Sequence, residues 1–259
     1  MNKRRVIYYK SETDDEFSVA RITPKKIDGS YDYLRDRAWE RFFKDRILRP
    51  VAFPLAGVYL RARFEHRVVN AELLAEYADR AYFLYGNHTQ DIADALIPSV
   101  LSPQKKAYTL AHPNNVSMPL LGKITPYLGA IPLPDDRAAR ENFSRAIDRR
   151  IGEGSAIVIY PEAHIWPYYT RIRHFSDNSF SYPIKYNAPV FCFTNTYQRG
   201  RRNEPQIVTY IDGPFFADNE LSHKQRRADL RDRVYKRMCQ RALLSTEERI
   251  KYIKVDEND

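Results

Sequence analysis

The chain has 259 residues, of which 43% are hydrophobic, and its 19 tyrosines and 13 phenylalanines supply enough apolar surface for a sizeable core. This composition excludes a wholly disordered protein. The net charge of +9 indicates anionic partners such as nucleic acid, phosphorylated metabolites or an anionic membrane surface. The two cysteines form no CxxC pair, so neither a disulfide framework nor a zinc ribbon is expected.

The first 65 residues divide into a polar arm and an amphipathic segment. Residues 1–30 are mixed in charge, and their basic residues precede no apolar run of the kind a secretory signal needs. In residues 31–65 bulky apolar side chains alternate with arginine and lysine, a pattern typical of a helix at a membrane interface or of one packed on a core. Pro50 and Pro54 should break or kink a single helix there. No stretch is apolar enough for a transmembrane helix.

From residue 81 onward, strand-like and helix-like segments alternate. Strands are expected in AYFLYG, KAYTLAH, AIPLP, SAIVIYPE, APVFCFTNTY and PQIVTYIDGP, and helices in DIADALIPSVL, SMPLLGKITPYLG, RAARENFSRAIDRRIGEG and HKQRRADLRDRVYKRMCQRALL. This order predicts one α/β domain with a mixed, largely parallel central sheet flanked by helices. We assign it to residues 66–259, after residues 1–65, which hold an N-terminal arm and an amphipathic helical segment that either faces a membrane or packs on the core.

Three polar stretches follow predicted strands. They are GNHTQDIAD after the first strand, PLPDDR after the third and PEAHIWPYYTRIR after the fourth. Ligands of open α/β sheets bind beyond the carboxyl ends of the strands, so these stretches are expected to meet at one site.

The first stretch holds a histidine with two acids behind it. A free histidine side chain has a pKa near neutrality, and a carboxylate from Asp91 or Asp94 bonded to the His88 ring would make His88 a general base. No GxSxG motif or nearby cysteine supplies a nucleophile, so the base is expected to act on a substrate hydroxyl. The acids are explained equally well as a helix cap. A metal site has no support from an HExxH or CxxC motif.

Other candidates lie in the second and third stretches. His164 follows the fourth strand and could contact a substrate. The guanidinium groups of Arg137, Arg171 and Arg173 match the geometry of a phosphate, although each is also explained as a surface charge.

The order of these stretches resembles the glycerolipid acyltransferase family, typified by 1-acyl-sn-glycerol-3-phosphate acyltransferases. That family has an Asn-His motif followed by an Asp, a Gly-x-x-x-Ile-Asp-Arg-type block, a Phe-Pro-Glu-Gly-Thr-Arg block and a late strand with proline. The corresponding stretches here are GNHTQDIAD, LGAIPLPDDR, IVIYPEAHIWPYYT and NAPVFCF, in order across roughly residues 80–215.

The chain departs from the family pattern at two places. Asp94 stands six residues after His88, one more than the family spacing. We prefer Asp94 as the orienting acid and give Asp91 the helix cap, because a longer loop could bring Asp94 back to the histidine. In addition, Ala163-His164-Ile165 replaces Gly-Thr-Arg, so Arg137, Arg171 or Arg173 would have to bind the acceptor phosphate.

The resemblance implies a fatty acyl transfer in phospholipid biosynthesis. His88, oriented by Asp94, would deprotonate a hydroxyl of a lysophospholipid such as lysophosphatidic acid, which then attacks the thioester of acyl-CoA or an acyl carrier protein. Glu162 would hold the acceptor or organise the loop. The resemblance implies no metal and no prosthetic group. A lipid acceptor favours peripheral docking on the cytoplasmic face of a membrane, and no nucleic acid is expected.

Two other functions fit part of the pattern. A basic nucleic-acid-binding α/β protein would account for the net charge, but no RNA- or DNA-recognition motif is present. A thioester hydrolase would use His88 to activate water instead of a lipid hydroxyl.

Overall fold

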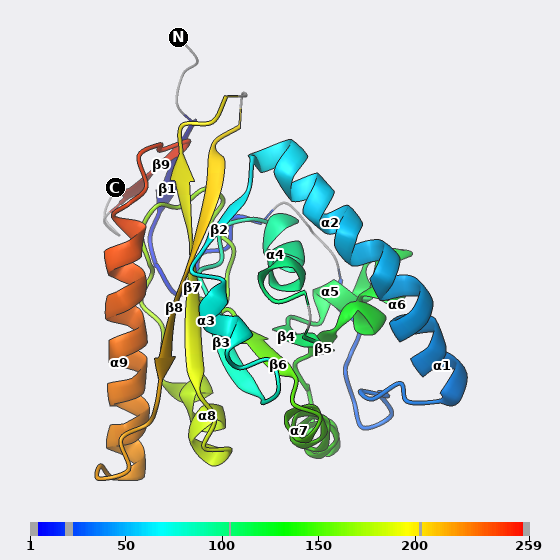
Figure 1. Ribbon diagram of the computed structural model, residues 1–259. Coiled ribbons are helices and arrows are strands. Elements are labelled where there is room, and N and C mark those ends of the chain that lie inside the picture. The colour runs from blue at the N-terminus through cyan, green and yellow to red at the C-terminus, as the bar shows by residue number, and fades with distance from the viewer. Residues whose placement is uncertain (1–4, 19–22, 104, 202–203, 256–259) are drawn as a thin grey trace.

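The computed structural model describes residues 5–18, 23–103, 105–201 and 204–255 (Figure 1). Its centre is a seven-stranded sheet in the order β2-β8-β7-β3-β6-β4-β5. Every neighbouring pair is parallel except β7 and β8. The strands are β2 (Arg67–Val69), β3 (Tyr82–Gly86), β4 (Ala107–Ala111), β5 (Ala130–Pro132), β6 (Ala156–Ile159), β7 (Val190–Gln198) and β8 (Gln206–Phe215). The mixed, largely parallel sheet is therefore confirmed.

Helices cover both faces of this sheet (Figure 1). They are α1 (Ala38–Phe42), α2 (Arg49–Phe64), α3 (Glu72–Ala75), α4 (Ala93–Leu101), α5 (Asn114–Ser117), α6 (Leu121–Leu128), α7 (Arg137–Gly152), α8 (Ser181–Lys185) and α9 (His223–Ala242), with a π-helical turn η1 (Phe43–Leu48) and a 3-10 turn η2 (Asn178–Phe180). Helices α7, α8 and α9 pack on one face, and α2, α3 and α4 on the other.

Strand β3 shows how the sequence builds the two cores. Side chains alternate between the faces of a strand, so Phe83 and Tyr85 join the core under α7 and α9, whereas Tyr82 and Leu84 join the core under α2 and α4. All four are buried. A strand buried on both faces is a continuous apolar run, which is why AYFLYG is recognisable from sequence.

The amphipathic segment forms one long helical rod from α1 through η1 to α2. Pro50 lies in the first turn of α2, where a missing N–H costs little, and follows the π-helical turn. Pro54 lies inside α2. Neither proline ends the helix. On its inner side, Leu60 and Phe64 belong to the core that includes α4.

The two ends of the chain form a second, two-stranded sheet. Strand β1 (Arg5–Tyr9) pairs in parallel with β9 (Ile250–Lys254), an element that the sequence pattern did not predict. Both strands pack on Trp166, which lies in the stretch after β6. The arm therefore includes a strand that is fixed to the far end of the chain. The domain boundary at residue 65 stays a prediction.

Candidate active site

His88 and Asp94 meet at the carboxyl end of β3. The His88 ring nitrogen Nδ1 lies 2.9 Å from Asp94 Oδ2. An ionised carboxylate only accepts hydrogen bonds, so Nδ1 carries the proton and Nε2 is left as the basic nitrogen. Nε2 has no hydrogen-bond partner among the described residues, and 18% of the His88 side chain is exposed. The pair therefore has the geometry of a general base oriented by a carboxylate.

The Asp94 carboxylate is buried and fully supplied with donors. Besides the His88 ring, its Oδ2 accepts the backbone N–H groups of Thr89 at 2.7 Å and Gln90 at 2.8 Å, and its Oδ1 accepts Asn195 Nδ2 at 3.2 Å. Its position in the first turn of α4 also favours a negative charge. Both effects hold the carboxylate in place as the partner of His88.

The extra residue between His88 and Asp94 is taken up by a turn. Asp91 and Ile92 form that turn, and α4 begins only at Ala93. The expected helix cap by Asp91 is wrong: the N-cap residue is Ile92, without a side-chain hydrogen bond, because Asp94 itself accepts the N–H groups at this end. Asp91 is exposed, and partial desolvation and the nearby Asp94 charge raise its pKa.

Tyr160 forms one wall of the site and was not singled out from the sequence. Its ring stacks on the His88 ring, with centroids 4.5 Å apart and an interplanar angle of 20°. Its hydroxyl donates to the backbone carbonyl of Asp94. Tyr160 immediately precedes the proline of the third block, but nothing in that local pattern indicates that its ring lies on the histidine.

Glu162 is a buried organiser of the site loop. Its carboxylate accepts the backbone N–H of His88 at 3.2 Å and that of Arg173 at 3.1 Å, and it pairs with the Arg173 guanidinium at 3.0 Å. Both side chains are 0% exposed. Of the two roles expected for Glu162, these contacts match organising the loop. The expectation that Arg173 binds a substrate phosphate is wrong, because its guanidinium is enclosed by Glu162 and the backbone carbonyls of Glu12 and His164.

The remaining predicted residues lie around this centre without forming one cluster. His164 Nδ1 is 2.8 Å from Glu16 Oε2 of the N-terminal arm. The exposed Arg171 lies over the Tyr169 ring. Arg137 is 94% exposed at the start of α7, with a loose contact to Glu141 at 3.7 Å. Of the three predicted phosphate-binding arginines, only Arg137 and Arg171 are therefore available to an anionic ligand.

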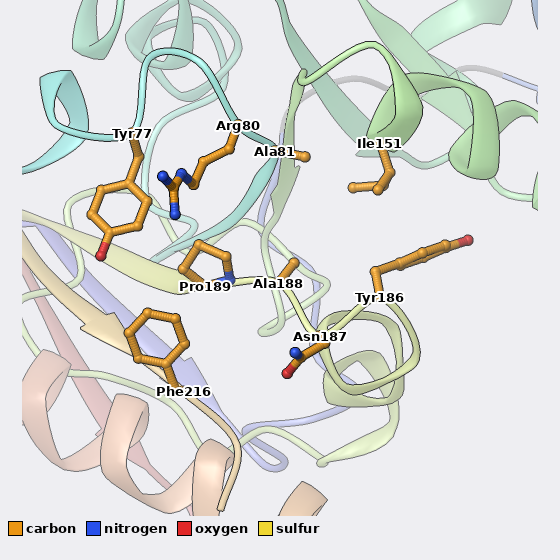
Figure 2. Close-up of a pocket in the computed structure, with 9 residues that line it drawn as sticks. All are labelled: Tyr77, Arg80, Ala81, Ile151, Tyr186, Asn187, Ala188, Pro189 and Phe216. Atoms are coloured by element: carbon orange, nitrogen blue, oxygen red, sulfur yellow. The ribbon is translucent and has the colours of Figure 1, made fainter.

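The pocket in Figure 2 lies at the other end of the sheet. Its volume is about 250 Å³, and its lining includes Ala81 before β3 and Pro189 before β7. His88 instead follows β3, so the pocket is separate from the His88–Asp94 pair. Within the described residues, no group of three or more potential ligands could hold a metal ion, and no helix is long and apolar enough to cross a membrane.

Comparison with known proteins identifies the family of this chain. The Acyltransferase family model matches residues 65–194, half of the chain, and the chain belongs to this family. It is therefore an acyltransferase, and the nucleic-acid-binding alternative is set aside. The match includes His88, Asp94 and Glu162.

A solved structure shows the same fold. The crystal structure of the 1-acyl-sn-glycerophosphate (LPA) acyltransferase, PlsC, from Thermotoga maritima superposes with a TM-score of 0.56 at 16% identity, covering 81% of this chain and 89% of that chain. No curated protein matches this chain.

Proposed function

We propose that the protein transfers a fatty acyl group from an acyl thioester, either acyl-CoA or acyl carrier protein, to a hydroxyl of a lysophospholipid such as lysophosphatidic acid. The observation that carries the proposal is the His88–Asp94 pair, whose Nε2 is free while Nδ1 is held at 2.9 Å by a buried carboxylate. The protein named in the structural comparison is an LPA acyltransferase, which supports this acceptor class.

The geometry supplies a direct route for the proton. Nε2 of His88 takes the proton of the acceptor hydroxyl, and the oxygen attacks the thioester carbonyl. The charge that develops on the imidazolium is stabilised by Asp94, to which Nδ1–H remains bonded. When the tetrahedral intermediate collapses, the C–S bond breaks and His88 returns the proton to the leaving thiolate. Atoms and charges balance without a further reactant.

Two parts of the substrate interaction follow from the exposed side chains. We assign the acceptor phosphate to Arg137 or Arg171, since both guanidinium groups are accessible whereas that of Arg173 is not. We assign membrane contact to the outer face of the α1–α2 rod, which exposes large apolar side chains. The protein would then act peripherally, on the cytoplasmic face where acyl-CoA and acyl carrier protein occur.

The test separates transfer from hydrolysis. Purified protein is given palmitoyl-CoA with and without lysophosphatidic acid, and both free thiol and phosphatidic acid are measured. The proposal expects thiol release to rise with the acceptor and to match phosphatidic acid formed. Thiol release that ignores the acceptor and yields free fatty acid would instead identify a hydrolase.

A further inference from the structure

Three buried polar side chains lie in or next to the sheet, close to the His88–Asp94 pair. Asn195 on β7 is 2% exposed, Thr209 on β8 is 0% exposed, and His66, between α2 and β2, is 9% exposed. Burying polar groups is costly unless they are hydrogen-bonded, so their partners indicate what they do.

Their hydrogen bonds form one continuous chain that ends at Asp94. His66 Nε2 lies 2.8 Å from Thr209 Oγ1, Thr209 Oγ1 lies 2.6 Å from Asn195 Oδ1, and Asn195 Nδ2 lies 3.2 Å from Asp94 Oδ1. The other carboxylate oxygen of Asp94 accepts from His88. The chain thus connects the segment that precedes β2 with the catalytic base.

The direction of every hydrogen bond is determined. Asn195 must donate through Nδ2 to the carboxylate, so its Oδ1 accepts the hydroxyl proton of Thr209. The Thr209 oxygen is then left as an acceptor, and His66 donates to it through Nε2–H. Burial lowers the pKa of His66 to about 4, so the ring is neutral near pH 7 and carries one N–H. Each donor therefore points toward Asp94.

The register of the strands brings the residues of this hydrogen-bond chain together. Asn195 and Thr209 are direct partners in the antiparallel β7–β8 pair. Gly86 pairs with Phe193 between β3 and β7, which puts Asn195 level with His88 two residues further on. The backbone of Asn195 is also fixed, since its N–H donates to Asn87 Oδ1 at 2.8 Å. The hydrogen-bond chain therefore crosses neighbouring strands whose backbones are held by their own pairing.

We propose that Asn195, Thr209 and His66 are positioning residues that fix the rotation of the Asp94 carboxylate, so that it holds His88 in the Nδ1–H form. This proposal rests on the proposed role of His88 as base. All three residues are buried, so each acts through Asp94 and not by direct contact with a substrate. A purely structural role would make them stabilise the sheet without influencing the His88 ring.

The sheet offers a matched control. Thr194 is 0% exposed on β7, and its hydroxyl has no hydrogen-bond partner in the described part of the chain. By strand alternation it faces the opposite side of the sheet from Asn195. Thr194→Val and Thr209→Val make the same chemical change in neighbouring strands, but only Thr209→Val interrupts the hydrogen-bond chain to Asp94.

The experiment compares Thr209→Val, Thr209→Ser and Thr194→Val by two measurements, acceptor-dependent transfer from palmitoyl-CoA to lysophosphatidic acid and NMR titration of the His88 ring. Thr209→Val removes the hydrogen bond that Thr209 donates to Asn195 and the one that it accepts from His66. We expect it to lower kcat by roughly 3- to 10-fold with little change in KM. The less stabilised carboxylate should hold the shared proton more strongly and raise the His88 pKa. Thr209→Ser should restore both values, and Thr194→Val should leave both unchanged.

The titration needs no substrate, so it tests the positioning role independently of the proposed function. If wild type transfers no acyl group, the proposed function fails, while the His88 titration still decides the positioning role. An unchanged His88 pKa in Thr209→Val, or the same change in Thr194→Val, overturns the positioning role. If Thr209→Val does not fold, His66→Phe against His66→Gln makes the same comparison, because glutamine can replace the N–H donor and phenylalanine cannot.

Discussion

Asp94 and Asp91 stand three residues apart, but their surroundings differ. Asp94 is buried and accepts four hydrogen bonds, one of them from His88, whereas Asp91 is exposed in the turn before α4. A catalytic carboxylate must keep one orientation while the imidazole gains a proton. Among the two acids, only Asp94 has contacts that impose such an orientation.

Asp94→Asn should therefore lower kcat by at least roughly 100-fold, since an amide no longer selects the Nδ1–H tautomer or stabilises the imidazolium. Asp91→Asn removes only a neighbouring charge and should change kcat by less than about tenfold. Steady-state kinetics of the two variants check this. Equal losses, or a larger loss for Asp91→Asn, would contradict the assigned partner.

His66 also predicts a pH dependence of stability. Its pKa is about 4 in the folded protein and ordinarily 6.5, so between these values the unfolded chain binds a proton that the folded chain does not. The stability due to the neutral ring is fully present above pH 6.5 and is lost as pH falls toward 4, by up to about 3 kcal/mol.

Urea unfolding of wild type and His66→Gln at pH 7 and pH 4.5 measures this contribution. Wild type should lose more unfolding free energy than the variant between the two pH values, because the glutamine side chain does not titrate. The carboxylates contribute equally to both proteins and cancel in the comparison. Parallel losses would show that His66 is not buried as described.

At the scale of elements, the α1–α2 rod has an inner and an outer face. Leu60 and Phe64 pack inward, whereas Val51, Leu55 and Val58 are 58%, 61% and 60% exposed. These three recur at the spacing of one helix face, and α1 extends the apolar surface with its own exposed aromatic side chains. Exposed apolar side chains among basic residues suit a helix lying in the membrane interface.

Leu55→Glu should weaken binding to vesicles containing phosphatidylglycerol, because it places a charge in the apolar face and repels anionic lipid. Flotation of both proteins with such vesicles measures the effect. Leu243→Glu is the control, since Leu243 is 83% exposed just after α9, a helix on the other side of the sheet (Figure 1). Equal binding of Leu55→Glu and wild type would argue against docking through this helix.

At the scale of the whole molecule, local patterns predicted the elements that are buried on both faces. Strand β3 is a continuous apolar run, β7 begins with one at residues 190–193, and α7 ends at a glycine, so the alternation of strands and helices was visible in the sequence. The pair β1–β9 was not, since its partners lie at opposite ends of the chain and neither has a local signal of pairing.

The candidate site shows the same contrast between local and long-range information. His88, Asp91 and Asp94 are close in sequence, so a pairing of the histidine with one of the acids could be proposed from spacing, and the family resemblance favoured Asp94. Asn195 and Thr209 reach the site only through the register of β7 with its neighbours, which no local pattern gives. The burial of Arg173 could not be predicted either, because it depends on Glu162 lying behind the loop.

The central claim is that His88 is the base of an acyl transfer, and its most direct test is acceptor-dependent formation of phosphatidic acid from palmitoyl-CoA by His88→Ala. We expect a rate at least roughly 100-fold below wild type, with the fold and the KM for palmitoyl-CoA preserved, since the partly exposed ring is removed without disturbing the core. A His88→Ala protein that keeps the wild-type rate would show that His88 is not the base.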